Sequence, residues 1–271
     1  MAEARLTLAG VDAAGVESQL LAGHLLRVDR PYLLAHPEAE LPDLAGESLL
    51  QRREAQEPLA YILGYREFYG RRFTVRPGVL IPRHETETLV SSALEENRSG
   101  LSVLDLGTGS GCIGITLAKE REDWDVTASD VSSQALEIAC ENAESLHAKV
   151  RFVASDLFEN LLGESFDLIV SNPPYIGIAE ELSREVKEFE PEQALFAGED
   201  GLVFYRRIAQ SAAAYLNDGG KLMLEVGYRQ AAAVSHVFRA NGWNVCPPVL
   251  DLSGVERVII AQHDWHCEGA S

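Results

Sequence analysis

The sequence predicts an α/β protein in which a mostly parallel sheet follows a smaller helical segment. From residue 101 onward, short apolar runs of strand length alternate with segments that carry apolar residues at helical spacing. Such alternation is typical of βαβ units, which form a parallel sheet with helices on both faces. Before that point, residues 1–75 show helical spacing that is interrupted by prolines.

We expect residues 1–75 to form a small domain of short helices. Apolar side chains recur there at helical spacing, for example at Leu21 and Leu25. A proline inside a helix removes a hydrogen bond and clashes with the preceding turn, so prolines divide the region into short pieces. These prolines are Pro31, Pro37, Pro42 and Pro58.

A β hairpin is expected to link this domain to the next, as far as about residue 85. Residues 68–80 are rich in β-forming side chains and glycine, and Pro82 ends the run. Residues 86–271 then form the second domain. Its expected strands are 102–106, 126–129, 150–153, 168–170, 221–226, 243–245 and 257–261. Its expected helices are 112–121, 132–146, 200–216 and 229–240.

The charge of the chain is unevenly distributed. The 271 residues carry a net charge of −19, and residues 81–271 hold 31 acidic against 14 basic side chains. A surface this acidic repels phosphate backbones, so we expect no direct binding of nucleic acid. Residues 1–80 are near neutral, with 11 acidic and 9 basic side chains. Their arginines, Arg66 and Arg71 among them, either meet an acidic partner or form a solvated face.

The cysteines and the lack of long apolar runs predict a cytoplasmic protein, which we expect to be a monomer. Cys112, Cys140, Cys246 and Cys267 are scattered, so we interpret them as reduced thiols. No apolar run approaches membrane-spanning length and no signal pattern is present, so we expect neither membrane insertion nor export. The tail 263–267 contains metal-capable groups, but this short polar terminus is expected to hold no metal.

A glycine-rich turn follows the first strand of the second domain. The chain runs from that strand through Gly107, Gly109 and Gly111 into a helix, with Thr108 and Ser110 between the glycines. Glycine allows a positive φ and a close approach to a ligand, to which a helix N-terminus offers free N–H groups. The turn is therefore expected to bind a cofactor.

Acidic residues near the turn favour one cofactor over another. Gly109, Gly111 and Gly114 satisfy the G-x-G-x-x-G pattern of dinucleotide sites. However, Asp105 repels a pyrophosphate and suits a cationic ligand, so S-adenosylmethionine is favoured over a nicotinamide dinucleotide. Asp130, at the end of the second strand, is placed to bind a ribose diol.

The end of the third strand supplies two further candidates. Asp156 and Leu157 follow that strand directly. There they would meet the amino edge and the face of an adenine, although ordinary core packing explains Leu157 equally well. Together with the glycine turn they predict an adenosyl site.

A second turn carries the candidate reactive groups. Asn172, Pro173, Pro174 and Tyr175 directly follow the apolar run 166–170. Two prolines cannot extend a strand, because neither has an N–H group and each keeps the preceding residue extended. The turn presents a carboxamide, a carbonyl and an aromatic ring, which together can hold a planar nitrogen that carries hydrogen. A lone Asn-Pro is more often an ordinary loop, and the second proline and the tyrosine argue against that interpretation.

These motifs together resemble the class I S-adenosylmethionine methyltransferases that methylate planar nitrogens. Over residues 55–261 the chain more specifically resembles the release factor glutamine methyltransferase family of the HemK type. The segments that carry this resemblance are 57–64, 66–68, 79–87, 190–195, 200–202, 205–206 and 225–227. One departure is His84, where the family usually has proline.

The resemblance implies a Rossmann-like methyltransferase domain that follows a helical domain and a hairpin. It also implies S-adenosylmethionine as cofactor, S-adenosylhomocysteine as product and bacterial peptide chain release factors as partners. The methyl acceptor would be the side-chain amide of the glutamine in their Gly-Gly-Gln loop. We assign recognition of the partner to residues 1–75, because they lack cofactor motifs and do not share the strong negative charge of the second domain.

The residues of the second turn suggest how such an amide is methylated. Asn172 Oδ1 and the Pro173 carbonyl can each accept one N–H, which aims the nitrogen lone pair at the methyl group. Tyr175 is expected to pack against the planar substrate and close the pocket, with core packing as the alternative. Pro174 and Arg83 complete the expected substrate site, although an interdomain salt bridge explains Arg83 nearly as well.

Two other functions compete with this one. An adenine amino-group methyltransferase of DNA or RNA uses the same kind of turn but must flip a base out of its stack. The acidity of the second domain argues against it. A non-catalytic module that binds adenosyl ligands is the other alternative, and the intact turn 172–175 argues against that module.

Overall fold

The computed structural model describes residues 2–36, 39 and 43–263, and this part of the chain forms two compact units. The smaller unit contains the residues up to Tyr65, together with Val75–Pro77 and Leu182–Glu190. The larger unit contains Arg66–Thr74, Gly78–Glu181 and the described residues from Pro191 onward.

The smaller unit consists of short helices. Within the described residues they are α1 (Ala2–Leu8), α2 (Ala14–Leu26), α3 (Arg30–Ala35), α4 (Asp43–Glu54), α5 (Leu59–Leu63) and α9 (Arg184–Phe189). Pro31 lies in the first turn of α3 and Pro58 directly precedes α5, so both prolines mark helix starts. The core of the unit contains Leu6, Val11, Ala14, Leu21, Leu50 and Ile62.

A buried arginine attaches a distant segment to this unit. Arg53 on α4 is only 3% exposed, and its guanidinium contacts Glu17 of α2 at 2.5 Å and Glu185 of α9 at 3.2 Å. A buried charge is costly unless it is paired, so the two carboxylates stabilise Arg53 and fix α9. The segment 182–190 thereby joins the helical unit, which the sequence did not lead us to expect.

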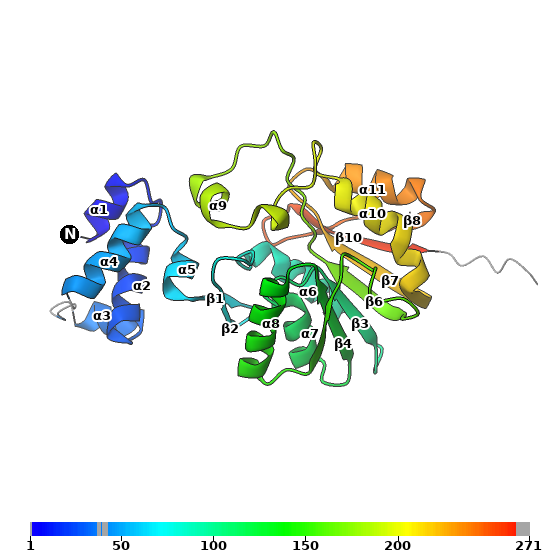
Figure 1. Cartoon of the computed structure of the whole chain (residues 1–271), viewed down its shortest axis with the longest axis horizontal. Coiled ribbons are helices and arrows are strands. Elements are labelled where there is room, and N and C mark those ends of the chain that lie inside the picture. The colour runs from blue at the N-terminus through cyan, green and yellow to red at the C-terminus, as the bar shows by residue number, and fades with distance from the viewer. Residues whose placement is uncertain (1, 37–38, 40–42, 264–271) are drawn as a thin grey trace, which may run out of the picture. The chain divides into compact units, whose positions relative to one another are not determined.

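The larger unit is built on a mostly parallel sheet, as predicted (Figure 1). Eight strands of the described chain pair in the order β5-β4-β3-β6-β7-β10-β8, with β9 beside β10. The pairs from β5 to β7 are parallel, whereas β10 is antiparallel to β7, β8 and β9. The strands are β3 (Ser102–Leu106), β4 (Asp125–Asp130), β5 (Val150–Ala154), β6 (Phe166–Ser171), β7 (Leu216–Glu225), β8 (Trp243–Val245), β9 (Val249–Leu250) and β10 (Glu256–His263). A separate hairpin consists of β1 (Tyr65–Phe68) and β2 (Arg71–Thr74).

Helices cover both faces of the sheet (Figure 1). Successive strand residues point to opposite faces, so Val103 and Leu168 pack in one core and Leu104 and Ile169 in the other. The first core is covered by α6 (Glu87–Leu94), α7 (Cys112–Glu120) and α8 (Ser133–Leu146). The second is covered by α10 (Val203–Ser211) and α11 (Ala231–Ala240). Three 3-10 turns occur among the described residues: η1 (His84–Thr86), η2 (Glu192–Ala194) and η3 (Ala212–Tyr215).

The hairpin packs into the first core of the larger unit. Phe68 and Phe73 are fully buried, and their ring centroids lie 6.0 Å apart in an edge-to-face arrangement. Asn142 of α8 holds the end of β2, because its Oδ1 accepts from the Thr74 N–H at 2.7 Å and its Nδ2 donates to the Thr74 carbonyl at 3.0 Å. The hairpin therefore contributes to the stability of the larger unit.

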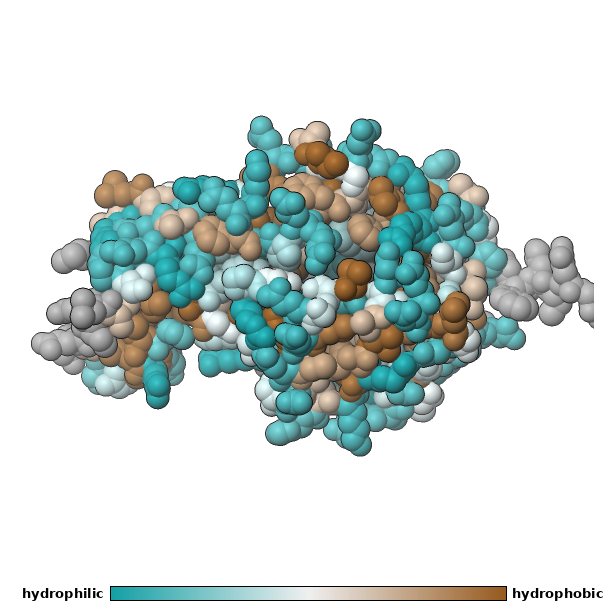
Figure 2. All heavy atoms as spheres, in the orientation of Figure 1, coloured by the Kyte–Doolittle hydropathy of each residue, from teal (hydrophilic) through white to brown (hydrophobic). Residues whose placement is uncertain are grey.

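Most residues on the face of the molecule drawn in Figure 2 are hydrophilic. Hydrophobic residues are scattered among them, which is ordinary for a globular protein. In the part of the chain that the structure describes, no helix combines the length and apolar character needed to cross a bilayer.

The described cysteines are free thiols. Cys112 is buried, Cys140 is half-buried and Cys246 is exposed. Cys267 and the rest of the tail from Asp264 onward lie outside the described residues. Within residues 2–36, 39 and 43–263, no group of His, Cys, Asp and Glu side chains is arranged to hold a metal ion.

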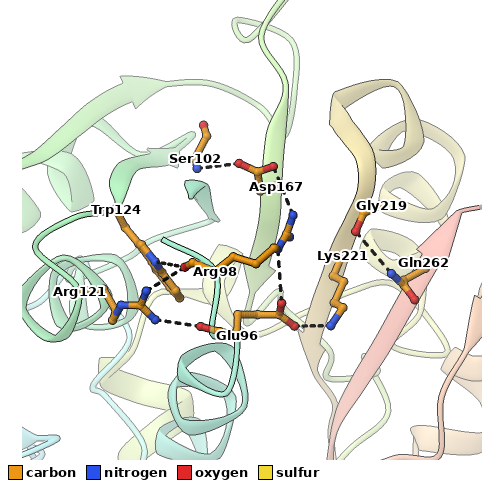
Figure 3. Close-up of polar contacts among 9 residues, drawn as sticks. All are labelled: Glu96, Arg98, Ser102, Arg121, Trp124, Asp167, Gly219, Lys221 and Gln262. Atoms are coloured by element: carbon orange, nitrogen blue, oxygen red, sulfur yellow. Dashed lines mark hydrogen bonds and ion pairs between the residues drawn. The ribbon is translucent and has the colours of Figure 1, made fainter. Parts of the chain in front are cut away.

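A polar network near the amino ends of β3 and β6 holds the segment between α6 and β3 (Figure 3). Arg121 donates hydrogen bonds to the carbonyls of Glu96 and Arg98, each at 2.8 Å. Its guanidinium lies over the ring of Trp124, 4.6 Å from the centroid. The Glu96 carboxylate forms an ion pair with Lys221 of β7. Arg121 therefore holds two successive parts of this segment through their carbonyls.

Replacing Arg121 with alanine is expected to lower the free energy of unfolding by about 2–3 kcal/mol, because the hydrogen bonds to the Glu96 and Arg98 carbonyls, the exposed ion pair with Asp123 and one cation–π contact are lost. Urea unfolding measures the change. Arg239→Ala is the control, since Arg239 on α11 makes one long hydrogen bond, to the Val245 carbonyl at 3.4 Å. Arg239→Ala is expected to lower the free energy of unfolding by less than about 0.5 kcal/mol. Equal decreases in the two variants would show that the network does not stabilise the unit.

Candidate active site

The buried carboxylate of Asp105 holds the glycine turn between β3 and α7 by hydrogen bonds. Asp105 Oδ2 accepts hydrogen bonds from Thr108 Oγ1 at 2.5 Å and from the Gly114 N–H at 2.8 Å. Gly111 has a φ of 84°, and a Cβ added there would lie 2.6 Å from Ile115 Cδ1. Only glycine fits such a position without strain, so the turn requires this residue.

Asp105 supports the turn rather than lining the cavity above it. The side chain is completely buried, and burial raises its pKa to about 6 in spite of the hydrogen bonds from Thr108 and Gly114. Its Oδ1 has no hydrogen-bond partner. The cavity is lined instead by Gly107, Gly109 and their neighbours in the turn. Direct contact between Asp105 and a cofactor stays a prediction.

Asp130 connects the end of β4 to the glycine turn. Its Oδ2 accepts from the Gly109 N–H at 2.8 Å, and its Oδ1 accepts from the Ser132 N–H at 2.9 Å. Burial raises the pKa of this carboxyl. Asp130 also lines the cavity, so its carboxylate lies where a ligand would bind.

Asp156 and Leu157 line the same cavity from the end of β5. Asp156 Oδ2 accepts a hydrogen bond from Arg207 Nη2 at 2.9 Å, an arginine of α10 that the sequence did not single out. Leu157 has a φ of 51°, a left-handed conformation that is strained for a bulky side chain. Such strain is typical of positions where the surrounding structure, or a ligand, fixes the backbone.

The second turn meets the glycine turn because β3 and β6 are neighbours in the sheet. Leu104 pairs with Ile169 and Asp105 with Val170, and Ser171 Oγ donates to the Leu106 carbonyl at 2.6 Å. The chain continues from β3 to one side of the sheet and from β6 to the other. Crevices at such switch points are the usual binding sites of open α/β sheets.

Asn172, Pro173 and Pro174 line the cavity, as does Arg83. The cavity has a volume of about 130 Å³, far above the roughly 10–15 Å³ that one water molecule needs. It is therefore large enough for a small organic molecule. The structure thus brings the two turns that the sequence singled out to one cavity within the larger unit.

Tyr175 differs from the other residues of its turn. Its ring packs against the second core, and burial together with the nearby Glu225 raises its pKa to about 12. The Tyr175 carbonyl accepts a hydrogen bond from Gln230 Nε2 at 2.8 Å. A Cβ added at Gly227 would lie 2.8 Å from Tyr175 Cδ2. The structure therefore gives Tyr175 a packing role, and its contact with a substrate stays a prediction.

Three functional candidates were missed by the sequence analysis. Asn142, the buried residue of α8, also donates from Nδ2 to the Ser110 carbonyl at 2.9 Å, which joins the glycine turn to the hairpin. Thr86 accepts a hydrogen bond from Asn172 Nδ2 at 3.2 Å and in turn bonds the side chain of Glu225. Thr86 and Glu225 lie in the segments 79–87 and 225–227 that carry the family resemblance, but the sequence assigned no role to either residue.

The chain has the Rossmann-like fold of solved methyltransferases. A methyltransferase from Pyrococcus furiosus matches 79% of this chain and 96% of its own with a TM-score of 0.54 at 20% identity. The 16S rRNA N2 G1207 methyltransferase of Thermus thermophilus, solved with AdoMet and guanosine, matches 74% of this chain and 50% of its own with a TM-score of 0.53 at 20% identity. At such identities the likeness concerns the fold alone.

Sequence comparison identifies the family. Residues 1–64 match the PrmC N-terminal domain, and residues 84–189 match the methyltransferase small domain. The release factor glutamine methyltransferase of Koribacter versatilis is 43% identical over 95% of this chain and 94% of its own length. That of Neisseria gonorrhoeae is 44% identical over 93% of this chain and 94% of its own. The chain belongs to the release factor glutamine methyltransferase family, which confirms the resemblance seen in the sequence.

Some relatives are longer. A bifunctional methyltransferase of Rickettsia bellii is 39% identical over 92% of this chain, which spans 51% of that protein. This chain therefore corresponds to about half of the bifunctional relative.

Proposed function

We propose that this protein transfers a methyl group from S-adenosylmethionine to the side-chain amide nitrogen of the glutamine in the Gly-Gly-Gln loop of peptide chain release factors. The observation that carries the proposal is the position of Asn172 and Pro173 on the same cavity as the glycine turn. Membership of the release factor glutamine methyltransferase family supports the choice of acceptor.

The residues around the glycine turn fit an adenosyl cofactor with a positive charge. The turn 107–110 lines the cavity, where its glycines allow close approach, and Asp130 and Asp156 line the cavity beside it. These carboxylates repel a pyrophosphate and attract a cation. When bound, S-adenosylmethionine supplies an electrophilic methyl group and leaves as S-adenosylhomocysteine. Asp130 would hold the ribose, and Asp156 and Leu157 the adenine.

The second turn orients the amide of the substrate. A carboxamide nitrogen is a poor nucleophile, because its lone pair is delocalised into the carbonyl. Asn172 Oδ1 and the Pro173 carbonyl would each accept one of its N–H groups and so direct the lone pair toward the methyl group. Positioning of this kind lowers a reaction barrier by several kcal/mol, about 7 kcal/mol or more in favourable cases. A strong base is not required beforehand, because the methylated nitrogen is very acidic and loses its proton readily.

Methyl transfer to competing acceptors tests the proposal. The protein is incubated with radiolabelled S-adenosylmethionine and, in parallel, with a bacterial release factor, single-stranded and duplex DNA, and RNA. Label is expected in the release factor alone. Label in nucleic acid would favour an adenine amino-group methyltransferase, and label in none of the acceptors would point to a binding module. Either result would contradict the proposal.

Replacing Asp130 with alanine is expected to weaken S-adenosylmethionine binding by about 1–3 kcal/mol, because a charged acceptor for the ribose and the anchor of the Gly109 N–H are both lost. Calorimetric titration measures the affinity. Asp125→Ala, at the exposed amino end of the same strand, is the matched control and should bind normally. Unchanged affinity in folded Asp130→Ala would mean that the ribose is held elsewhere.

A further inference from the structure

The Asn172 carboxamide is one end of a chain of hydrogen bonds that leads away from the cavity. Its Nδ2 donates to Thr86 Oγ1 at 3.2 Å, and the Thr86 hydroxyl bonds the side chain of Glu225. The three residues come from the turn after β6, the end of η1 and the end of β7. Asn172 and Thr86 line the cavity, whereas Glu225 is 1% exposed. Glu225 is therefore linked to Asn172 by hydrogen bonds through Thr86.

The direction of these hydrogen bonds follows from the hydrogens available. A threonine hydroxyl has one hydrogen, and an ionised carboxylate only accepts. The Thr86 hydrogen therefore goes to Glu225, and Thr86 Oγ1 is left to accept from the amide. Since the oxygen and nitrogen of a carboxamide have nearly the same size, shape alone does not select between its two orientations. The hydrogen-bond chain makes the selection: it turns Nδ2 toward Thr86 and leaves Oδ1 for the substrate.

We propose that Thr86 and Glu225 are positioning residues that fix the orientation of the Asn172 carboxamide, so that its oxygen and not its NH₂ group meets the substrate amide. The inference rests on the function proposed above, because it concerns the same acceptor nitrogen. With the carboxamide inverted, Nδ2–H would face the NH₂ group of the glutamine, donor against donor. One of the two acceptors that orient the reacting nitrogen would then be lost.

Protonation of Glu225 allows the direction of these hydrogen bonds to reverse. Burial raises the pKa of Glu225 to about 7, although the hydrogen bond from Thr86 acts in the opposite direction. A protonated carboxyl can donate to Thr86, which frees the Thr86 hydrogen for Asn172 Oδ1. Because the pKa in the folded protein lies above its usual value, the productive orientation is present above about pH 7 and is lost as the pH falls through that value. The charged and titratable groups that face Glu225 are Arg83, Glu85, Cys112, Tyr175, Tyr205 and Arg257.

Steady-state methylation of intact release factor by the full-length protein tests the role of Thr86. Thr86→Val removes the hydroxyl at nearly constant volume and is expected to lower kcat about tenfold, the effect of one misplaced hydrogen bond. The calorimetric affinity for S-adenosylmethionine should not change. Thr86→Ser keeps the hydroxyl and should recover most of the rate. Thr116→Val is the matched control, because Thr116 of α7 is also buried and its hydroxyl has no hydrogen-bond partner; its kcat should equal that of the wild type.

The pH dependence of kcat tests the role of Glu225. The wild-type rate is expected to fall on the acidic side of about pH 7, and Glu225→Gln, which cannot ionise, should lack this limb between about pH 6 and 8. If Thr86→Val does not fold, the pH dependence of kcat in Glu225→Gln still tests whether the hydrogen-bond chain orients Asn172. Wild-type kcat in folded Thr86→Val, or an unchanged acidic limb in Glu225→Gln, would overturn the inference alone. A wild type that methylates no release factor would overturn the proposed function and the inference with it.

Discussion

Asn172→Ala is expected to slow methyl transfer to release factor by about a hundredfold or more, because one of the two acceptors that orient the amide nitrogen is removed. S-adenosylmethionine should still bind, since the glycine turn and Asp130 are untouched. Single-turnover methylation with saturating cofactor measures the chemical step separately from binding. Asn241→Ala, at the end of α11, is the control and should react at the wild-type rate.

Asn172→Asp is the finer test of the same turn. Aspartate keeps an acceptor toward the substrate but loses the NH₂ group that donates to Thr86 Oγ1. It also places a second carboxylate near the buried Glu225, which disfavours ionisation of both groups. We expect a rate above that of the alanine variant and below that of the wild type. A wild-type rate in Asn172→Ala would show that this turn is not the catalytic site.

The second large effect is expected from removing the helical unit. Deletion of residues 2–64 should leave the affinity for S-adenosylmethionine nearly intact, because all residues that line the cavity belong to the larger unit. Methylation of intact release factor should fall about a hundredfold, which corresponds to the loss of about 3 kcal/mol of binding. The cut precedes the hairpin, because Phe68 and Phe73 are needed in the core of the larger unit.

A short peptide that contains the Gly-Gly-Gln sequence supplies the control for the truncation. The peptide is too small to contact a separate recognition domain, so the full-length and truncated proteins should methylate it at similar rates. Calorimetry of cofactor binding checks that the truncated protein is folded. A truncated protein that is folded and methylates intact release factor at the normal rate would show that residues 2–64 do not recognise the partner.

The central sheet was predictable because its strands are buried on both faces and therefore read as apolar runs. The boundary between α10 and β7 was not. A helix over 200–216 and a strand from residue 221 were expected, whereas α10 ends at Ser211, η3 follows, and β7 begins at Leu216. The polar residues 217–220 have the composition of a turn and interrupt the ladder, because Phe166 pairs with Leu216 and Leu168 already with Lys221. The pairing of Leu216 before this irregularity moves the start of the strand ahead of the expected residue 221.

The positions of the two turns followed from the sequence, but the residues behind them did not. Glycines and prolines impose recognisable backbone constraints, so 107–111 and 172–175 stand out as a pattern. The hydrogen bonds of Thr86 with Asn172 and of Asn142 with Ser110 join residues far apart in the chain. No periodicity records such pairs, because they depend on how the elements pack. The attachment of α9 to the helical unit through Arg53 and Glu185 escaped prediction for the same reason.

The position of the transferred methyl group shows directly whether the glutamine amide of the release factor is the acceptor. Intact release factor is methylated with S-adenosylmethionine that carries an isotopically labelled methyl group, digested, and sequenced by fragmentation mass spectrometry. We expect a single labelled methyl group on the side-chain amide of the glutamine in the Gly-Gly-Gln loop, and no label when that glutamine is replaced by alanine. A labelled methyl group on any other residue, or a label that persists after the replacement, would contradict the proposed function.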